Sequence, residues 1–126
     1  MKKIAVFILL IIGTSCEMCR DMRSLGVNEF SRYLKRRNVV LIDVRTPEEY
    51  AEGHIPGTDF NINVLDDSFE REILDRISPD SHVAIYCRSG NRSKTAGAVL
   101  VNNCYKVVEL ESGFKGWKEA GKKIEH

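Results

Sequence analysis

The sequence of 126 residues predicts an α/β protein built on a parallel β-sheet. Two continuous apolar runs, Val39–Ile42 and Val83–Tyr86, have the β-branched and aromatic content of strands that are buried on both faces. Segments with the helical spacing of apolar residues alternate with these runs. Such alternation is typical of a parallel sheet that is covered by helices, and the chain has the length of one ordinary domain.

The chain begins with a segment that is typical of exported proteins. Met1–Lys3 is basic, residues 4–12 are all apolar, and the small residues 13–15 precede Cys16. This order of features predicts a secretory signal peptide. The apolar run has nine residues, which at 1.5 Å each are too short to cross the ~30 Å hydrocarbon core of a bilayer as a helix. The small residues before Cys16 resemble the lipobox of bacterial lipoproteins, which implies a lipid on Cys16.

Three segments follow from this interpretation. We expect residues 1–15 to be the signal peptide, residues 16–26 a tether, and residues 27–126 the folded domain. The protein would then be exported to the bacterial periplasm and anchored to the membrane through Cys16. The net charge of the whole chain is only +1, so there is no global basic field of the kind that nucleic-acid-binding proteins carry.

The first half of the domain has clear start and stop signals. A helix is expected to begin in the segment 27–30, with Asn28 as its N-cap. The strand 39–42 leads into Asp43, Val44 and Arg45, and Thr46 then precedes a proline and two glutamates, which predicts an N-capped helix. Residues 53–57 form a turn-rich loop, and a further amphipathic helix is expected over 67–77, its apolar face listed in chain order as Phe69, Ile73, Leu74 and Ile77.

The stretch 83–97 combines a buried strand, a polar loop and a helix around one cysteine. Cys87 follows the strand directly, Gly90 lies at the centre of the loop, and the helical stripe begins at Ala96. The first amides of a helix have no partner within it, and the helix dipole adds positive potential. A loop that curls around the sulfur would therefore aim its amides at Cys87.

Two arginines, Arg88 and Arg92, add full positive charges to this loop. Thiols in such electropositive settings have pKa values of roughly 3.5–7.5. We therefore expect Cys87 to be a thiolate at neutral pH, and not the small buried apolar residue that a free cysteine usually is. The same loop would bind an oxyanion, or stabilise a second sulfur that carries negative charge. A strand from 106 to 110 completes the alternating pattern.

Three blocks of the sequence resemble the signatures of the rhodanese-like domain family, in the order in which that family has them. The blocks are Leu41–Tyr50 with Gly53–Gly57 and Asn61, then Cys87–Ser93, then Ser112–Trp117 with Ala120 and Gly121. They span nearly all of the expected mature chain. The resemblance implies a five-stranded parallel sheet with helices on both faces, and a catalytic loop at the carboxyl end of a central strand.

The resemblance also implies an activity, namely that of a single-domain sulfurtransferase. Cys87 would take a sulfane sulfur from a donor such as thiosulfate, hold it as a persulfide, and pass it to cyanide or a thiol. The substrate-binding residues implied by the loop are Arg88, Ser89, Gly90, Asn91 and Arg92. Asp43 and Arg45 would support the strand end and the loop, and His54 would pack against the loop instead of acting as a base. No cofactor is implied. The partners would be a small sulfur-containing anion and a thiol acceptor, such as a thioredoxin-like protein.

Two alternatives remain open at this stage. The phosphatases that share this fold have five residues between the cysteine and the arginine, whereas here four residues separate Cys87 from Arg92. That shorter loop favours a cavity for a sulfur atom over one for phosphate or arsenate. A non-catalytic module that carries sulfur or interacts with a redox partner is the second alternative.

The remaining cysteines do not predict a metal site. Cys16 and Cys19 have the spacing of metal and redox motifs, but no second pair at ligand spacing accompanies them. In an oxidising compartment the four cysteines of the chain could form two disulfides. Cys104 follows a predicted helix, and we expect it to be a core or loop residue.

Overall fold

A computed structural model describes residues 21–126, so the expected signal peptide, Cys16 and Cys19 lie outside the described residues. Five strands form one sheet in the order β1-β5-β4-β2-β3, and every pair of neighbours is parallel. The strands are β1 (Arg23–Leu25), β2 (Val39–Asp43), β3 (Phe60–Asn61), β4 (His82–Tyr86) and β5 (Lys106–Leu110). The parallel α/β architecture predicted from the sequence is confirmed.

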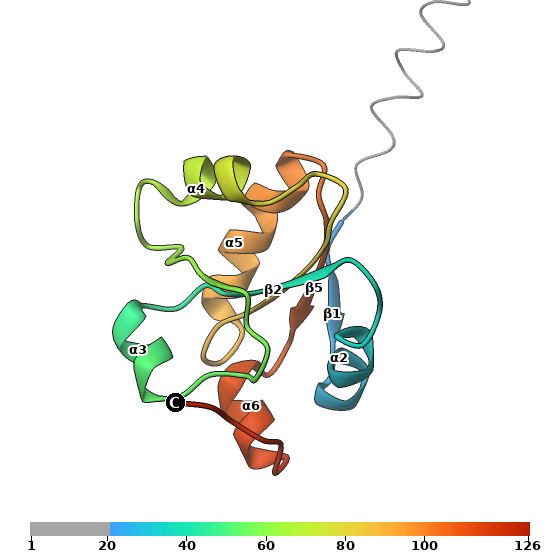
Figure 1. Ribbon diagram of the computed structural model, residues 1–126, viewed down its shortest axis with the longest axis vertical. Coiled ribbons are helices and arrows are strands. Elements are labelled where there is room, and N and C mark those ends of the chain that lie inside the picture. Colours follow the sequence, from blue (N-terminus) through green and yellow to red (C-terminus); the bar gives the residue numbers. More distant parts are fainter. Residues whose placement is uncertain (1–20) are drawn as a thin grey trace, which may run out of the picture.

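Helices cover both faces of this sheet, as Figure 1 shows. The helices are α2 (Val27–Tyr33), α3 (Pro47–Glu52), α4 (Phe69–Arg76), α5 (Asn91–Asn102) and α6 (Gly113–Glu119). Helices α4 and α5 pack on one face and contribute Ile73 and Leu100 to its apolar cluster. Helices α2 and α6 pack on the other face, where Phe30 and Trp117 belong to a second cluster. The sheet therefore lies between two separate cores.

The central strand β4 places the cysteine. Side chains of a strand alternate between the two faces of its sheet. Val83 and Ile85 belong to the cluster under α4 and α5, whereas Ala84 and Tyr86 belong to the opposite cluster. Cys87 continues this alternation and joins the cluster of Val83 and Ile85. Its side chain thus lies on the face from which α5 begins.

The structure corrects the expected start of the domain. Residues 23–25, which the sequence placed in a tether, form strand β1 and pair with β5. Leu25 is buried, but Arg23 and Ser24 are exposed, so the segment has no apolar run that would mark it as a strand. Helix α2 begins at Val27 with Gly26 as its N-cap, and the expected cap Asn28 lies inside the helix.

Other local predictions are confirmed or adjusted. Thr46 caps α3: its hydroxyl accepts from the Glu49 amide, the Glu49 carboxylate accepts from the Thr46 amide, and Pro47 is the first helical residue. Helix α4 is shorter than the expected 67–77, and Leu74 is 52% exposed instead of facing the core. Among the helices of residues 21–126, none has the length and apolar character needed to cross a membrane.

Candidate functional site

The Cys87 sulfur lies inside a loop between β4 and α5. Cys87 is 1% exposed, and the Gly90 amide donates a hydrogen bond to Sγ at 3.1 Å. Gly90 is also the N-cap of the twelve-residue helix α5, so the positive end of the helix dipole points toward this loop. Of the loop amides that the sequence led us to expect around the sulfur, the Gly90 amide makes this hydrogen bond. The thiolate state of Cys87 stays a prediction.

Two glycines allow the loop to close against α6. Gly90 has φ +100°, and a Cβ on it would lie 2.3 Å from the Glu111 carbonyl oxygen. Gly113 has φ +67°, and a Cβ there would lie 2.3 Å from the Arg88 carbonyl oxygen. This close approach lets the first amides of α6 reach the loop: Phe114 N–H donates to the Cys87 carbonyl at 2.8 Å, and Lys115 N–H donates to that of Arg88 at 2.9 Å. The loop backbone is therefore fixed from two sides.

Arg88 projects from the loop into a cavity. The residue is exposed, and it lines a cavity of about 460 Å³ between the loop, α3 and α6. Lys115 and Lys118 of α6 line the same cavity, as does Glu52 of α3. Cations therefore outnumber free carboxylates around Arg88. Ser89 and Asn91, which the sequence also predicted as substrate-binding residues, are exposed beside it.

Arg92 has a partner that the sequence did not reveal. Its guanidinium donates to both carboxylate oxygens of Glu49, at 2.6 and 2.9 Å, and both side chains are about one quarter exposed. The hydrogen bonds from Arg92 lower the pKa of Glu49 to about 2, against a smaller opposing effect of burial. Glu49 is also the residue that completes the cap of α3. Helix α3 and the cysteine loop are joined through this pair.

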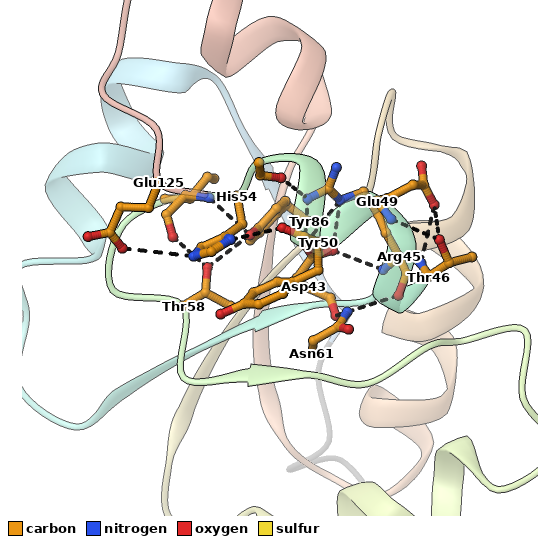
Figure 2. Close-up of polar contacts among 12 residues, drawn as sticks. Asp43, Arg45, Thr46, Glu49, Tyr50, His54, Thr58, Asn61, Tyr86 and Glu125 are labelled. Carbon is orange, nitrogen blue, oxygen red and sulfur yellow. Dashed lines mark hydrogen bonds and ion pairs between the residues drawn. The ribbon is translucent and has the colours of Figure 1, made fainter.

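Asp43 and Arg45 form a buried pair at the end of β2, as Figure 2 shows. Arg45 Nε donates to Asp43 Oδ1 at 2.9 Å, and Nη2 donates to Oδ2 at 2.6 Å and to the Gly53 carbonyl at 2.7 Å. The guanidinium carbon lies 4.5 Å from the centre of the Phe114 ring. Asn61 Nδ2 donates to the Asp43 and Arg45 carbonyls at 3.1 and 3.0 Å. These contacts connect the end of β2 with Gly53 after α3 and with Phe114 of α6. The supporting role of Asp43 and Arg45 stays a prediction.

His54 makes its contacts away from the cysteine loop. Its Nδ1 lies 3.0 Å from the Tyr50 carbonyl oxygen, and its ring stacks on the Tyr50 ring at 3.9 Å (Figure 2). Its Nε2 lies 3.8 Å from Glu125 Oε1. Backbone hydrogen bonds in both directions between His54 and Glu125 hold the C-terminal segment here. These contacts hold His54 between α3 and the C-terminal segment. That it packs against the cysteine loop and does not act as a base stays a prediction.

A second carboxylate, that of Glu109, contacts the first turn of α5 next to the cysteine loop. Glu109 of β5 is fully buried and accepts hydrogen bonds from the side chains of Ser93 and Lys94 in the first turn of α5. Sequence reasoning missed it, although one signal was available: a glutamate stands in the middle of the apolar strand 106–110. A buried charge needs partners, so such a residue marks a polar network.

The described residues include one further cysteine, Cys104. Cys104 lies exposed in the turn after α5, as one of the two expected alternatives had it, and it is disulfide-bonded; the alternative that placed it in the core was wrong. Among the described residues, Cys87 is the free cysteine. Residues 21–126 contain no group of three or more side chains that could hold a metal ion.

Comparison with known proteins adds a family model and individual relatives. The model described as "Rhodanese-like domain" matches residues 26–120. The uncharacterised protein YqhL of Bacillus subtilis is 34% identical over 114 residues, covering 90% of this chain and 86% of the relative. A protein named sulfurtransferase from Allochromatium vinosum is 35% identical over 97 residues, covering 71% and 81%. The thiosulfate sulfurtransferase GlpE of Pseudoalteromonas translucida is 29% identical over 101 residues, covering 78% and 90%.

Solved structures give the same fold. A rhodanese-related protein from Thermoplasma volcanium has a TM-score of 0.71 and 29% identity, over 82% of this chain and 97% of its own. A Rhodopseudomonas palustris protein described as a possible tyrosine phosphatase has a TM-score of 0.68 and 28% identity, over 82% of this chain and 85% of its own.

Proposed function

The chain belongs to the rhodanese-like domain family, and we propose that it is a sulfurtransferase that carries sulfane sulfur as a persulfide on Cys87. The names of the relatives from Allochromatium vinosum and Pseudoalteromonas translucida support the transferase class. One observation carries the choice of Cys87. Its sulfur is the free thiol of the described residues, and it accepts a backbone hydrogen bond at the start of a long helix.

The reaction we propose has two displacement steps. In the first, the Cys87 thiolate attacks the outer sulfur of thiosulfate, the S–S bond of the donor breaks, and sulfite leaves with the electron pair. Cys87 then holds a persulfide anion. In the second, cyanide attacks the outer sulfur, the persulfide S–S bond breaks, thiocyanate leaves, and Cys87 is again a thiolate. A thiol acceptor would receive the sulfur in the same way and become a persulfide.

The residues around Cys87 would have different roles in this reaction. The Gly90 amide and the start of α5 stabilise negative charge on sulfur, as preorganised donors do in other active sites. Arg88 is exposed at the cavity and would hold the sulfonate end of the donor. Arg92 contributes positive potential but is already paired with Glu49, so a donor anion has to share it. Ser89 and Asn91 would contact the donor at the rim.

Mass spectrometry of the intact protein tests this proposal. Incubation with thiosulfate should add the mass of one sulfur atom, and subsequent cyanide should remove it with release of thiocyanate. Cys87→Ser should gain nothing. Serine is close in size to cysteine, so the thermal unfolding of Cys87→Ser should match that of the native protein. This comparison is the control for correct folding. A gain that persists in Cys87→Ser would refute the assignment.

Phosphatase or arsenate-reductase-like chemistry is the competing proposal. Its support is the similar solved structure from Rhodopseudomonas palustris, which is described as a possible tyrosine phosphatase. The loop argues against it, because only four residues separate Cys87 from Arg92. Hydrolysis of an aryl phosphate, or reduction of arsenate, without any sulfur uptake would decide for it. Sulfur uptake without turnover to any thiol or cyanide would instead indicate a carrier module.

Export and lipid attachment remain proposals that rest on residues outside the described part of the chain. We propose that Cys16 carries a lipid and that the domain works in the periplasm, where a thioredoxin-like protein could supply the acceptor thiol. Replacement of Cys16 by alanine should release the protein from the membrane fraction and alter its processing. Unchanged membrane retention would contradict the lipid.

A further inference from the structure

Glu109 is a buried carboxylate to which the proposed chemistry gives no role. It lies in β5 and is 0% exposed. The Ser24 hydroxyl of β1 donates to its Oε2 at 2.5 Å, and the Ser93 hydroxyl of α5 donates to its Oε1 at 2.5 Å. Lys94 Nζ also donates to Oε2. The Glu109 carboxylate therefore accepts hydrogen bonds from two other elements, strand β1 and helix α5.

This carboxylate is charged at neutral pH. Burial alone would raise the pKa of Glu109, but the hydrogen bonds from Lys94, Ser24 and Ser93 together outweigh burial and hold the pKa below its usual value. Lys94, whose side chain is half exposed, balances the charge of the carboxylate. A negative group therefore stays permanently under the first turn of α5.

The Ser93 hydroxyl stands between this carboxylate and the reacting sulfur. Ser93 Oγ lies 2.5 Å from Glu109 Oε1 and 3.6 Å from Cys87 Sγ, with the thiol as the donor of the longer contact. A serine hydroxyl has a single proton and two lone pairs. An ionised carboxylate is a stronger acceptor than a sulfur or a carbonyl, so the proton lies on the side of Glu109. Ser93 then presents a lone pair to Cys87, which favours an S–H group and disfavours a thiolate.

Other groups around the sulfur act in the opposite direction. The Gly90 amide donates to Sγ, and the guanidinium of Arg92 interacts electrostatically with Cys87. Other charged groups near the loop are Arg88, Lys94 of α5, Glu49 of α3, which pairs with Arg92, and the Asp43–Arg45 pair at the end of β2. The state of the sulfur is therefore set by a balance between amides and cations on one side and carboxylates on the other, and Glu109 is the carboxylate that reaches it through a hydroxyl group.

We propose that Glu109 is a positioning residue that acts through the Ser93 hydroxyl and raises the pH at which the Cys87 sulfur loses its proton to solvent. The inference rests on the proposed function only in taking Cys87 as the reacting group. Its consequence for sulfur transfer is that the negative charge on the Cys87 sulfur depends on the Gly90 amide and the arginines of the loop, which act against the effect of Glu109.

Replacement of Glu109 by glutamine tests the proposal without any sulfur donor. Glutamine keeps the size of the side chain and removes its charge. The thiolate absorbs in the ultraviolet, so absorbance can be followed against pH, and subtracting the trace of Cys87→Ser cancels the other cysteines. Glu109→Gln should lower the midpoint of the Cys87 transition by about one pH unit, which is the shift that a neighbouring charge typically causes. An unchanged midpoint would overturn the proposal.

The sign of the effect of Ser93→Ala separates this role from the ordinary one. A serine that donates to a thiolate stabilises it, so its removal would raise the midpoint. A serine whose proton is held by Glu109 destabilises the thiolate, so its removal should lower the midpoint. Because Ser93→Ala removes only one hydroxyl, it also provides the test if Glu109→Gln fails to fold. A midpoint that rises or stays the same in Ser93→Ala refutes the role of Glu109.

A double variant shows whether the effect passes through Ser93. In a Ser93→Ala background, Glu109→Gln should shift the midpoint by less than half as much as it does in the native background. An equal shift would mean that Glu109 acts through space as a simple charge, and would overturn the positioning role. Glu111→Gln is the matched control, because Glu111 is an exposed carboxylate that immediately follows β5. It should leave the midpoint unchanged.

Discussion

Two arginine–carboxylate pairs lie near the carboxyl edge of the sheet, and they differ mainly in their exposure to water. In the Asp43–Arg45 pair, the side chains are 0% and 4% exposed. In the Glu49–Arg92 pair, they are 27% and 25% exposed. Both pairs are bidentate, with their shortest contact at 2.6 Å in each case. The chemistry of the two contacts is therefore the same, and the surroundings are not.

This difference suggests different roles for the two pairs. A buried charge that loses its partner has no water to replace it, so separating Arg45 from Asp43 is costly. Glu49 and Arg92 can exchange partners more easily, because water can solvate either side chain and an anion can take the place of Glu49 beside Arg92. The first pair is thus suited to holding the strand end in place. The second is suited to releasing Arg92 toward a substrate.

The largest expected effect is on stability. Arg45→Met keeps an unbranched apolar stem but leaves Asp43 buried without its cation, and should cost about 3–5 kcal/mol of unfolding free energy. Arg92→Met removes the corresponding cation at the rim and should cost about 1 kcal/mol or less. Denaturant unfolding with an unchanged m-value measures both. Equal losses in the two variants would abolish the distinction between a buried and a rim pair.

The second expected effect concerns acid. The pKa of Glu49 is about 2 in the folded protein, below its ordinary value of 4.5. A lowered pKa means that the pair contributes stability above about pH 4.5, and that this contribution is lost as pH falls toward 2. After allowance for solvent screening, the loss should be about 1–2 kcal/mol, because protonation of Glu49 weakens its hydrogen bonds from Thr46 as well as its pair with Arg92. The difference in unfolding free energy between the native protein and Glu49→Gln, measured at pH 6 and at pH 3, reports it. A difference that does not change with pH would contradict the pairing.

Local patterns were enough to predict the elements that carry the site. Strand β4, Gly90 and the start of α5 each have signals within a few residues of Cys87, and the cap of α3 is a motif of the four residues Thr46–Glu49. Strand β1 was missed because it is an edge strand of three residues with one buried side chain. Strand β3 has only two residues, which is too short for any periodicity.

The pairings of the site could not be predicted from local patterns. Glu49 and Arg92 are 43 residues apart, and Ser93 and Glu109 are 16 apart. The residues next to either glutamate in the sequence do not specify its partner. The partner depends on which strands and helices the fold brings together. The sequence identified Arg88 and Arg92 as equivalent cations, whereas the fold leaves Arg88 at a cavity and gives Arg92 a carboxylate.

The smallest expected effect is on the affinity for the donor, and it tests directly whether the rim pair opens. Glu49→Gln removes the anion that competes with thiosulfate for Arg92, while a glutamine at this position can still complete the helix cap. One added unit of positive charge near a donor dianion is worth about 1 kcal/mol in a site open to water, so KM for thiosulfate should fall about fivefold. Steady-state kinetics with cyanide as acceptor measures this. Glu48→Gln is the matched control, because Glu48 is an exposed carboxylate in the same first turn, and it should change KM little. A higher KM in Glu49→Gln would show instead that Glu49 is needed to orient Arg92 and that the pair does not exchange partners.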